Sequence, residues 1–226
     1  MTGSSAESRA PDHFERIYAT APDPWNYATS AYEREKYART LAALPRERYR
    51  RALEIGCSIG VLTAQLATRC DALLSIDVAE RALAEARIRC AALPHVEFAR
   101  LQVPQAFPEG RFDLIVVSEV GYYWSQADLQ RACRQIVDRL EPGGHLLLVH
   151  FTGEADDFAI SGDAVHDAFL AWTGERMRVA HGTPAVAPNG ASAPAAPPND
   201  AALRHLGGWR ERHGALGYRL DLFARR

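Results

Sequence analysis

The stretch Ala52-Leu53-Glu54-Ile55-Gly56-Cys57-Ser58-Ile59-Gly60 decides the fold of this chain. An apolar run ends at an acid, two glycines bracket a turn, and apolar residues then recur at helical spacing over residues 61–67. This order predicts a buried strand, a tight turn and the start of a helix. Glycine at positions 56 and 60 permits unusual backbone angles and removes Cβ atoms, so a ligand can lie against the main chain. The helix N-terminus adds free N–H groups and a partial positive charge.

A second acid follows at the end of the next apolar run, Leu73-Leu74-Ser75-Ile76-Asp77. In nucleotide-binding α/β folds, an acid about twenty residues beyond the glycine turn binds the ribose hydroxyls. Ser58 stands where the dinucleotide fingerprint has its second glycine, so the pattern favours a mononucleoside cofactor over a nicotinamide or a flavin. The alternative is that the glycines only make a strand-to-helix turn and that Asp77 only begins the next helix.

Composition limits the class of protein. The 226 residues are 47% hydrophobic and carry a formal charge of −2, which suits one soluble domain and argues against a basic nucleic-acid footprint. The four cysteines have no CxxC or zinc-like spacing, so we expect them to be reduced and buried, and we expect no metal site. The polar start is unlike a signal peptide and no apolar run is long enough to span a membrane. The expected compartment is the cytoplasm.

Short strands alternate with amphipathic helices through the middle of the sequence, which predicts parallel βαβ units with helices on both faces of a sheet. Ligands bind such sheets beyond the carboxyl ends of the strands, where the strand order reverses. We therefore expect the glycine turn, Asp77, Ser118-Glu119 and His150 to share one rim. The predicted strands are 51–55, 72–76, 95–99, 112–118 and 145–151, and the predicted helices are about 60–69, 79–92 and 125–140.

We expect one domain with four parts: a disordered tail over 1–10, a helical cap over 11–45, a cofactor-binding core over 46–151 and a C-terminal part over 152–226. Helices are predicted from Asp12 as N-cap, from about Ser30 to Leu44, and after Ser161 or Asp163. The low-complexity segment 182–200 predicts a mobile loop, and the alternation over 218–223 predicts a last strand.

These segments resemble class I S-adenosylmethionine-dependent methyltransferases. The resemblance is carried by the acid-ended first strand with its glycine turn, by Asp77, by the strand that begins Phe112-Asp113-Leu114-Ile115, and by Glu141-Pro142-Gly143-Gly144. The chain is more closely similar to the nodulation protein S (NodS) group, which N-methylates a chitooligosaccharide amine. The matching segments are Asp23-Pro24-Trp25, Tyr32-Glu33-Arg34-Glu35-Lys36-Tyr37, residues 53–60, Ser118-Glu119-Val120-Gly121-Tyr122-Tyr123 and Gly162-Asp163-Ala164-Val165-His166.

The resemblance implies a Rossmann-like seven-stranded sheet, mostly parallel with an antiparallel last strand, with helices on both faces and an N-terminal helical cap. It implies S-adenosyl-L-methionine as the cofactor and S-adenosyl-L-homocysteine as its product. Glu54 and Gly56 would face the amino-acid part of the donor, and Asp77 and Val78 its ribose. The expected cofactor-binding residues are Glu54, Gly56, Cys57, Ser58, Gly60, Asp77, Val78, Gln102, Ser118 and Lys36.

Methyl transfer from a sulfonium is an in-line displacement that depends on alignment, and an amine acceptor must lose its proton before it can attack. His150 is the first candidate for the base and Glu119 the second, and Tyr123 completes the expected catalytic set. Each of these side chains could instead be structural. The residues expected to bind the substrate are Trp25, Tyr32, Tyr122 and His166.

The expected function is methylation of a small molecule, with N-methylation of an amino sugar or related amine as the first reading. The alternatives are O- or N-methylation of another metabolite, and a donor-binding accessory protein that does not catalyse. The glycine pattern disfavours a nicotinamide oxidoreductase. We expect neither nucleic acid nor membrane as a partner, and the oligomeric state stays open. Gly121 stands where relatives often have a larger apolar residue, so it is expected to widen the acceptor pocket.

Overall fold

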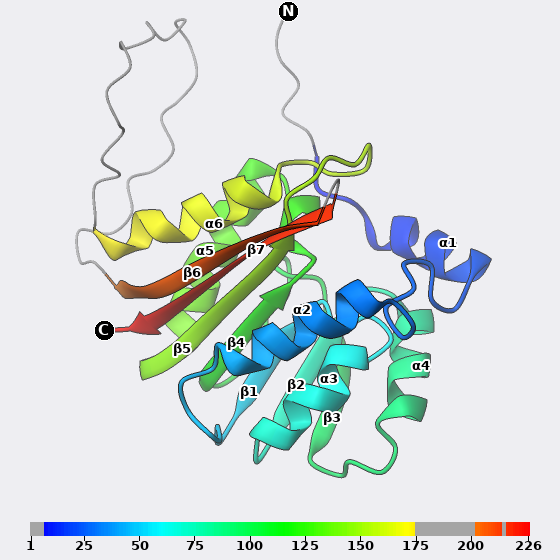
Figure 1. The fold of residues 1–226 in the computed structure, drawn as a ribbon, viewed down its shortest axis with the longest axis horizontal. Coiled ribbons are helices and arrows are strands. Elements are labelled where there is room, and N and C mark those ends of the chain that lie inside the picture. Colours follow the sequence, from blue (N-terminus) through cyan, green and yellow to red (C-terminus); the bar gives the residue numbers. More distant parts are fainter. Residues whose placement is uncertain (1–6, 175–201, 214–215) are drawn as a thin grey trace, which may run out of the picture.

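A seven-stranded sheet organises the part of the chain that the computed structural model describes, which is residues 7–174, 202–213 and 216–226 (Figure 1). The strand order is β3-β2-β1-β4-β5-β7-β6. The strands are β1 (Ala52–Ile55), β2 (Leu73–Asp77), β3 (Val96–Arg100), β4 (Phe112–Ser118), β5 (Leu140–Phe151), β6 (Leu203–His213) and β7 (Leu216–Arg225).

The direction of the strands agrees with the sequence-based expectation. β1 pairs in parallel with both β2 and β4, and β4 pairs in parallel with β5. β7 lies antiparallel between β5 and β6. The mostly parallel sheet with an antiparallel last strand is therefore confirmed. The strand order reverses between β1 and β4, which is where a ligand crevice opens in a sheet of this kind.

Helices cover both faces of the sheet. Serine side chains cap three of them, because Ser30, Ser125 and Ser161 each accept a hydrogen bond from the main-chain N–H three residues further on. The helices are α1 (Pro11–Thr20), α2 (Ala31–Ala42), α3 (Val61–Leu66), α4 (Glu80–Arg89), α5 (Gln126–Arg139) and α6 (Gly162–Leu170), and short 3₁₀ turns are η1 (Ala67–Arg69), η2 (Gly121–Tyr123) and η3 (Ala171–Thr173).

Alternate residues of the central strand β4 belong to two different cores. Ile115 and Val117 pack in the cluster that includes the apolar faces of α5 and α6. Leu114 and Val116 pack in the cluster that includes residues of α2 and α3. Successive side chains of a strand point to opposite faces, so an unbroken apolar run is what a strand buried on both faces requires. This explains the unbroken apolar run of β4 in the sequence.

Several predicted boundaries differ from the structure. The helix predicted over 60–69 is α3 followed by the tighter turn η1, and the helix predicted over 79–92 ends earlier, at Arg89. Strand β5 begins at Leu140 rather than 145, because Leu140 already pairs with Phe112 before a register shift. Asp12 is not the N-cap of α1. Ala10 holds that position and Pro11 occupies the first turn, where its missing N–H costs nothing.

Strand β6 was missed by the sequence analysis. Its residues are mostly polar and include the pair Gly207-Gly208, which by themselves indicate a loop. Pairing along almost the whole length of β7 makes this segment a strand, with a register shift between His205 and Gly207.

The expected tail over 1–10 is wrong for its described part. The main-chain N–H of Arg9 donates to the carbonyl of Tyr123 at 2.9 Å, and the Ser8 hydroxyl bonds Asp128. Residues 7–10 are therefore attached to η2 and to the first turn of α5. The loop predicted over 182–200 lies outside the described residues.

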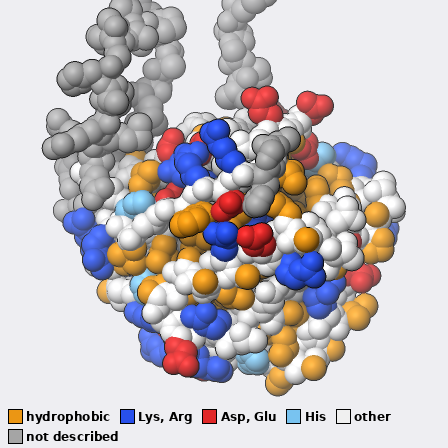
Figure 2. All heavy atoms as spheres, viewed as in Figure 1, with side chains coloured by type: hydrophobic (Ala, Val, Ile, Leu, Met, Phe, Trp, Pro, Cys, Tyr) orange, Lys and Arg blue, Asp and Glu red, His pale blue; other side chains and the backbone are white. Residues whose placement is uncertain are grey.

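One expectation from composition is confirmed. All four cysteines are free and buried. In the face drawn in Figure 2, basic and acidic side chains are interspersed with apolar ones, in keeping with the near-neutral charge. Within the described ranges, no helix combines the length and apolar character needed to cross a membrane.

Candidate functional site

A cavity opens at the carboxyl ends of β1, β2 and β4, where the strand order reverses. It holds about 1000 Å³ of empty space when the solvent at its mouth is included. The sheet supplies the floor through the turn after β1, and the N-terminal part of the chain supplies aromatic side chains from α1, α2 and the connection between them.

The structure brings most of the predicted site residues together and leaves the others behind the cavity wall. Those that line the cavity are Trp25, Glu54, Gly56, Cys57, Ser58, Asp77, Val78, Gln102, Ser118, Glu119 and Tyr123. Those that do not line it are Tyr32, Lys36, Gly60, Tyr122, His150 and His166.

Glu54 is a buried carboxyl with one oxygen committed to the protein. The hydroxyls of Thr63 and Ser75 both donate to its Oε2, at 2.6 and 2.7 Å. Within the described part of the chain, Oε1 receives no hydrogen bond. Burial raises the pKa of Glu54 to about 7, and the two hydroxyls only partly offset this effect. A buried carboxyl of this kind gains from a cationic ligand, which would restore its usual ionisation.

Asp77 is held by the backbone of the glycine turn. The main-chain N–H of Ser58 donates to Oδ2 at 2.9 Å, and that of Ala79 donates to Oδ1 at 3.0 Å. Burial raises the pKa of Asp77, although these N–H groups pull it down. Ser58 also takes a φ of 50°, an uncommon angle for a residue with a side chain. Its hydroxyl lies 2.5 Å from the Tyr18 hydroxyl, which joins α1 to the turn.

The two glycines of the turn have different roles. Gly56, with a φ of 85°, borders the cavity, and a Cβ there would lie 3.1 Å from the Ser118 carbonyl oxygen. Gly60, with a φ of 77°, lies outside the cavity, and a Cβ there would lie 3.0 Å from Ala86 on α4. The expectation that Gly60 exposes main chain to a ligand is therefore corrected. Its missing side chain lets α3 and α4 approach each other.

Glu119 follows β4 and faces the cavity with its carboxylate fully engaged. Lys36 donates to Oε1 at 2.6 Å, while the Tyr122 hydroxyl and the Phe151 main-chain N–H donate to Oε2 at 2.8 and 2.9 Å. The residue has a φ of 55°, which is strained for a side chain of this size. Both carboxylate oxygens of Glu119 are thus occupied by donors from the protein itself.

Lys36 is the only lysine of the sequence and is buried behind Glu119. Its ammonium group also donates to Glu33 at 2.8 Å. Burial by itself would lower the pKa of Lys36, but Glu119 and then Glu33 outweigh it and raise the pKa above its usual value. Lys36 therefore acts on the cavity through Glu119, and the expected direct contact with a cofactor is corrected.

Of the three tyrosines predicted for the site, one lines the cavity and two pack behind its wall. The Tyr123 side chain lines the cavity. Tyr122 points the other way, bonds Glu119 and stacks on Phe158 with ring centroids 3.8 Å apart. Tyr32 makes an edge contact with Tyr218 at 6.1 Å. The expected substrate contacts of Tyr32 and Tyr122 are thus replaced by packing behind the wall.

The two histidines are fully buried beyond η2 and do not reach the cavity. His150 Nε2 receives the main-chain N–H of Gly121 at 3.1 Å, and His150 Nδ1 lies 3.1 Å from His166 Nε2. The expectation that His150 is a base, and that His166 contacts the substrate, is corrected by this geometry. A nitrogen whose lone pair already accepts a main-chain N–H cannot take a proton from a molecule in the cavity.

Gly121 does not widen the cavity. A Cβ at this position would lie 2.6 Å from Val165 Cγ1 and 2.9 Å from His150 Nε2. Val165 of α6 and His150 occupy the space that a side chain at position 121 would need. The glycine therefore lets η2 pack against them and adds no space to the cavity.

The family model of Nodulation protein S (NodS) matches residues 9–159, which is more than half of the chain. The chain belongs to the NodS family. This agrees with the resemblance inferred from the glycine turn and the segments around Trp25, Lys36 and Tyr123.

Individual NodS proteins match part of the sequence. Nodulation protein S of Sinorhizobium fredii NGR234 is 37% identical over 129 residues, which are 56% of this chain and 60% of that protein. Nodulation protein S of Rhizobium tropici is also 37% identical over 129 residues, or 56% of this chain and 54% of that protein. The matched part of the chain thus spans little more than half the length of these relatives.

A solved NodS structure matches the whole fold. The crystal structure of N-methyltransferase NodS from Bradyrhizobium japonicum WM9 in complex with S-adenosyl-L-homocysteine superimposes with a TM-score of 0.74. The identity is 25%, and the match covers 95% of this chain and 97% of that one. The methyltransferase type of sheet expected for this NodS family member is confirmed.

Sequence reasoning missed several cavity residues of this NodS family member. Tyr18, Tyr27 and Tyr37 line the cavity, as do Ser8 and Arg9 near the N-terminus. The one signal for the three tyrosines was their position in the predicted helical cap over 11–45. No pattern could show that Tyr18 reaches Ser58, because the two residues are 40 positions apart. Among the described residues, no cluster of side chains could hold a metal ion.

The ion pairs behind the cavity give a stability prediction. Lys36→Met should lower the free energy of unfolding by about 3–5 kcal/mol, because it leaves the buried Glu33 and the partly buried Glu119 without their cation. Arg39→Met is the matched control on the same helix, since the Arg39–Glu35 pair is exposed to solvent. Urea denaturation measures both variants. Equal losses in the two variants would contradict the importance of the buried pairs.

Proposed function

We propose that this chain is an S-adenosylmethionine-dependent N-methyltransferase that acts on a small-molecule amine, with an amino sugar as the preferred class of acceptor. The observation that carries the proposal is the cavity floor, where Glu54 and Asp77 lie at the ends of adjacent strands. Beside them is the turn at Gly56, which has no side chain to cover the main chain. Membership of the NodS family and the similarity to a NodS structure that contains S-adenosyl-L-homocysteine support it.

The residues present fit the donor. The free oxygen of Glu54 suits an α-ammonium group, and Asp77 keeps acceptor capacity for ribose hydroxyls beside its two main-chain donors. Gly56 allows the donor to lie against the main chain, and Val78 and Gln102 border the region proposed for the adenosine. S-adenosylmethionine would supply there a methyl group on a sulfonium. The chain's part is to align that group with the acceptor and to exclude water.

The acceptor side is proposed to lie between Glu119 and the aromatic residues of the N-terminal part. Trp25, Tyr27 and Tyr37 line this part of the cavity together with Tyr123. Aromatic faces attract cations and also suit the apolar faces of a sugar ring, which favours an amino sugar over an acidic acceptor. Glu119, with its three donors, orients the amine and stabilises the developing positive charge. The amine loses its proton to solvent before transfer, because only the neutral amine has a lone pair that can attack the methyl group.

Donor binding is tested by thermal unfolding with S-adenosyl-L-homocysteine. At about a hundred times the dissociation constant, the ligand should stabilise the fold by about 2.7 kcal/mol, which raises the melting temperature by about 5–10 °C for a chain of this length. Asp77→Ala should weaken binding by about tenfold or more, because the ribose loses its acceptor. Asp71→Ala, at an exposed pair with Arg48, is the control. A shift with NAD and none with S-adenosyl-L-homocysteine would sink the proposal.

Donor binding should also depend on pH through Glu54, whose pKa of about 7 lies above its unfolded value of 4.5. Protonated Glu54 stabilises the ligand-free fold, and this contribution is lost as the pH rises through about 7. An ammonium group needs the carboxylate form. The dissociation constant of S-adenosyl-L-homocysteine should therefore rise by up to about tenfold per unit as the pH falls below 7.

Isothermal titration calorimetry between pH 5.5 and 8, in buffers of different ionisation enthalpy, measures this proton release. Glu54→Gln should remove the acidic limb and bind weakly throughout. A wild-type affinity that stays constant over this range would contradict the assigned contact between Glu54 and the ammonium group.

The acceptor class is tested with a panel of amines, phenols and carboxylic acids in the presence of S-adenosylmethionine. Glucosamine and its short β-linked oligomers should be methylated on nitrogen. Mass spectrometry should show an increase of about 14 Da, because one methyl group replaces one hydrogen, and the N-acetylated controls should show no increase. Methylation of hydroxyl or carboxyl groups alone would replace the amine proposal. Donor binding without turnover of any panel member would favour the accessory role.

A further inference from the structure

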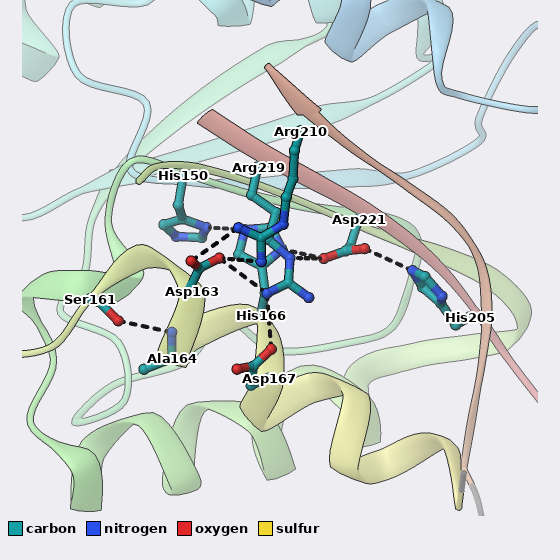
Figure 3. A network of polar contacts seen from close by, with 10 residues as sticks. All are labelled: His150, Ser161, Asp163, Ala164, His166, Asp167, His205, Arg210, Arg219 and Asp221. Carbon is teal, nitrogen blue, oxygen red and sulfur yellow. Dashed lines mark hydrogen bonds and ion pairs between the residues drawn. The ribbon is translucent and has the colours of Figure 1, made fainter. Parts of the chain in front are cut away.

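A buried row of polar side chains runs from β7 through α6 to β5 (Figure 3). Asp221 on β7 bonds His166 on α6 at 2.7 Å, and His166 bonds His150 on β5 at 3.1 Å. His150 in turn meets the main-chain N–H of Gly121 at the start of η2. All three residues are at most 3% exposed. We name these three residues the Asp221–His166–His150 series.

The series has only one consistent arrangement of protons. The Gly121 main-chain N–H is always a donor, so His150 Nε2 must be the acceptor of that bond. A neutral His150 then carries its proton on Nδ1 and donates it to His166 Nε2. His166 carries its own proton on Nδ1 and donates it to Asp221. Each ring is thus a neutral Nδ1–H tautomer, and every donor points from Gly121 towards Asp221.

The groups around the series favour this neutral state. Burial, followed by His166, Lys36 and Arg219, lowers the pKa of His150 well below its usual value. Burial also lowers the pKa of His166, although Asp221 opposes it. Asp221 stays ionised because it accepts from Arg219 at 2.7 Å and meets His205 at 2.8 Å. Arg219 is held in turn by Asp163 and Asp167 of α6.

The turn at the end of the series forms part of the cavity wall. Gly121 begins η2, and Tyr123, which ends it, lines the cavity. The middle residue is fixed from the other side, since the Tyr122 carbonyl accepts the N–H of Ala159 at 2.8 Å. The N–H of Gly121 has His150 as its partner. The acceptor Nε2 therefore fixes where the turn starts and, through it, where the Tyr123 ring stands.

We propose that His150, His166 and Asp221 are positioning residues that hold η2, and with it Tyr123, at the acceptor side of the cavity. The inference rests on the proposed function for the statement that this side receives the acceptor. A role as a proton path from the cavity is excluded by the same geometry, because the only ring nitrogen of His150 that faces η2 is filled by a main-chain donor. The close approach also requires glycine, since a Cβ at position 121 would lie 2.9 Å from Nε2.

Two variants of one residue separate the proposal from a purely structural role. In His150→Gln, the side-chain oxygen can occupy the place of Nε2 and still accept the Gly121 N–H. In His150→Asn, the shorter amide can replace Nδ1 and keep the bond to His166, but no acceptor reaches Gly121. We expect amide hydrogen exchange at Gly121 to accelerate about tenfold in the Asn variant and to stay near wild type in the Gln variant.

The same pair is assayed with S-adenosyl-L-homocysteine and with a glucosamine oligomer. Both variants should bind S-adenosyl-L-homocysteine within about twofold of wild type, because the series touches none of the proposed donor contacts. Methyl transfer should fall about tenfold or more in the Asn variant, through kcat or the acceptor KM, and much less in the Gln variant. Equal impairment in both variants, or none in either, overturns the proposal.

A measurement on the unsubstituted protein keeps the proposal testable if either variant fails to fold. NMR of histidine labelled with ¹⁵N should show His150 and His166 as neutral Nδ1–H tautomers at pH 7. An Nε2–H tautomer or a protonated ring at His150 overturns it, because such a ring cannot accept the Gly121 N–H. If no panel amine is methylated, the proposed function fails, while the tautomers and the amide exchange still decide whether the series holds the turn.

Discussion

The parallel pairing of β1 with both β2 and β4 is the constraint on which the rest of the structure depends. Because the chain leaves β1 in one direction along the sheet and returns on its other side, no crossover helix covers the carboxyl end of β1. The cavity follows from this reversal. Glu54, the Gly56 turn and Glu119 reach it because they end adjacent strands, although they are widely separated in sequence.

Burial of charge is handled differently on the two sides of that cavity. Glu54 is buried with neutral hydroxyl donors, so its pKa rises to about 7 and it stays ready for a cation. Glu119 is partly buried and is paired with the buried Lys36, which keeps its carboxylate in place. The carboxyl group of Glu54, which has no cationic partner in the part of the chain that the structure describes, can therefore bind a charged ligand. The carboxylate of Glu119, which is paired with Lys36, instead forms a fixed part of the cavity wall. The proposed donor and acceptor sides differ in this respect.

The N-terminal part of the chain completes the site from outside the sheet. Tyr18 bonds Ser58, Arg9 bonds Tyr123 through the main chain, and Lys36 reaches Glu119. Each contact joins a residue of the first forty to a loop at the end of a strand. On the opposite side, the Asp221–His166–His150 series supports the same wall from behind. The loop after β4 is thus held between two groups of buried polar contacts, which suits a segment with a strained backbone at Glu119.

How far the sequence could predict the protein is clear from particular residues. The apolar run of β4 and the acid-glycine turn after β1 gave the sheet, the cavity floor and the family, because these patterns are local and their periods differ between strand and helix. Strand β6 could not be predicted, because its polar, glycine-containing residues become a strand only through pairing with β7. His150 was expected at the rim because it lies near the carboxyl end of β5, but its side chain points into the α6 side of the sheet.

The sequence by itself therefore determined the fold class, the glycine turn with its two acids, and the membership of the NodS family. The tertiary structure alone decided which polar side chains face the cavity and which stand behind it, as with Glu119 and Lys36 or Tyr123 and Tyr122. The physical reason is that spacing along a chain fixes the element a residue belongs to, whereas its partners come from distant segments. Lys36 and Glu119 are separated by 83 positions, and Asp221 and His166 by 55.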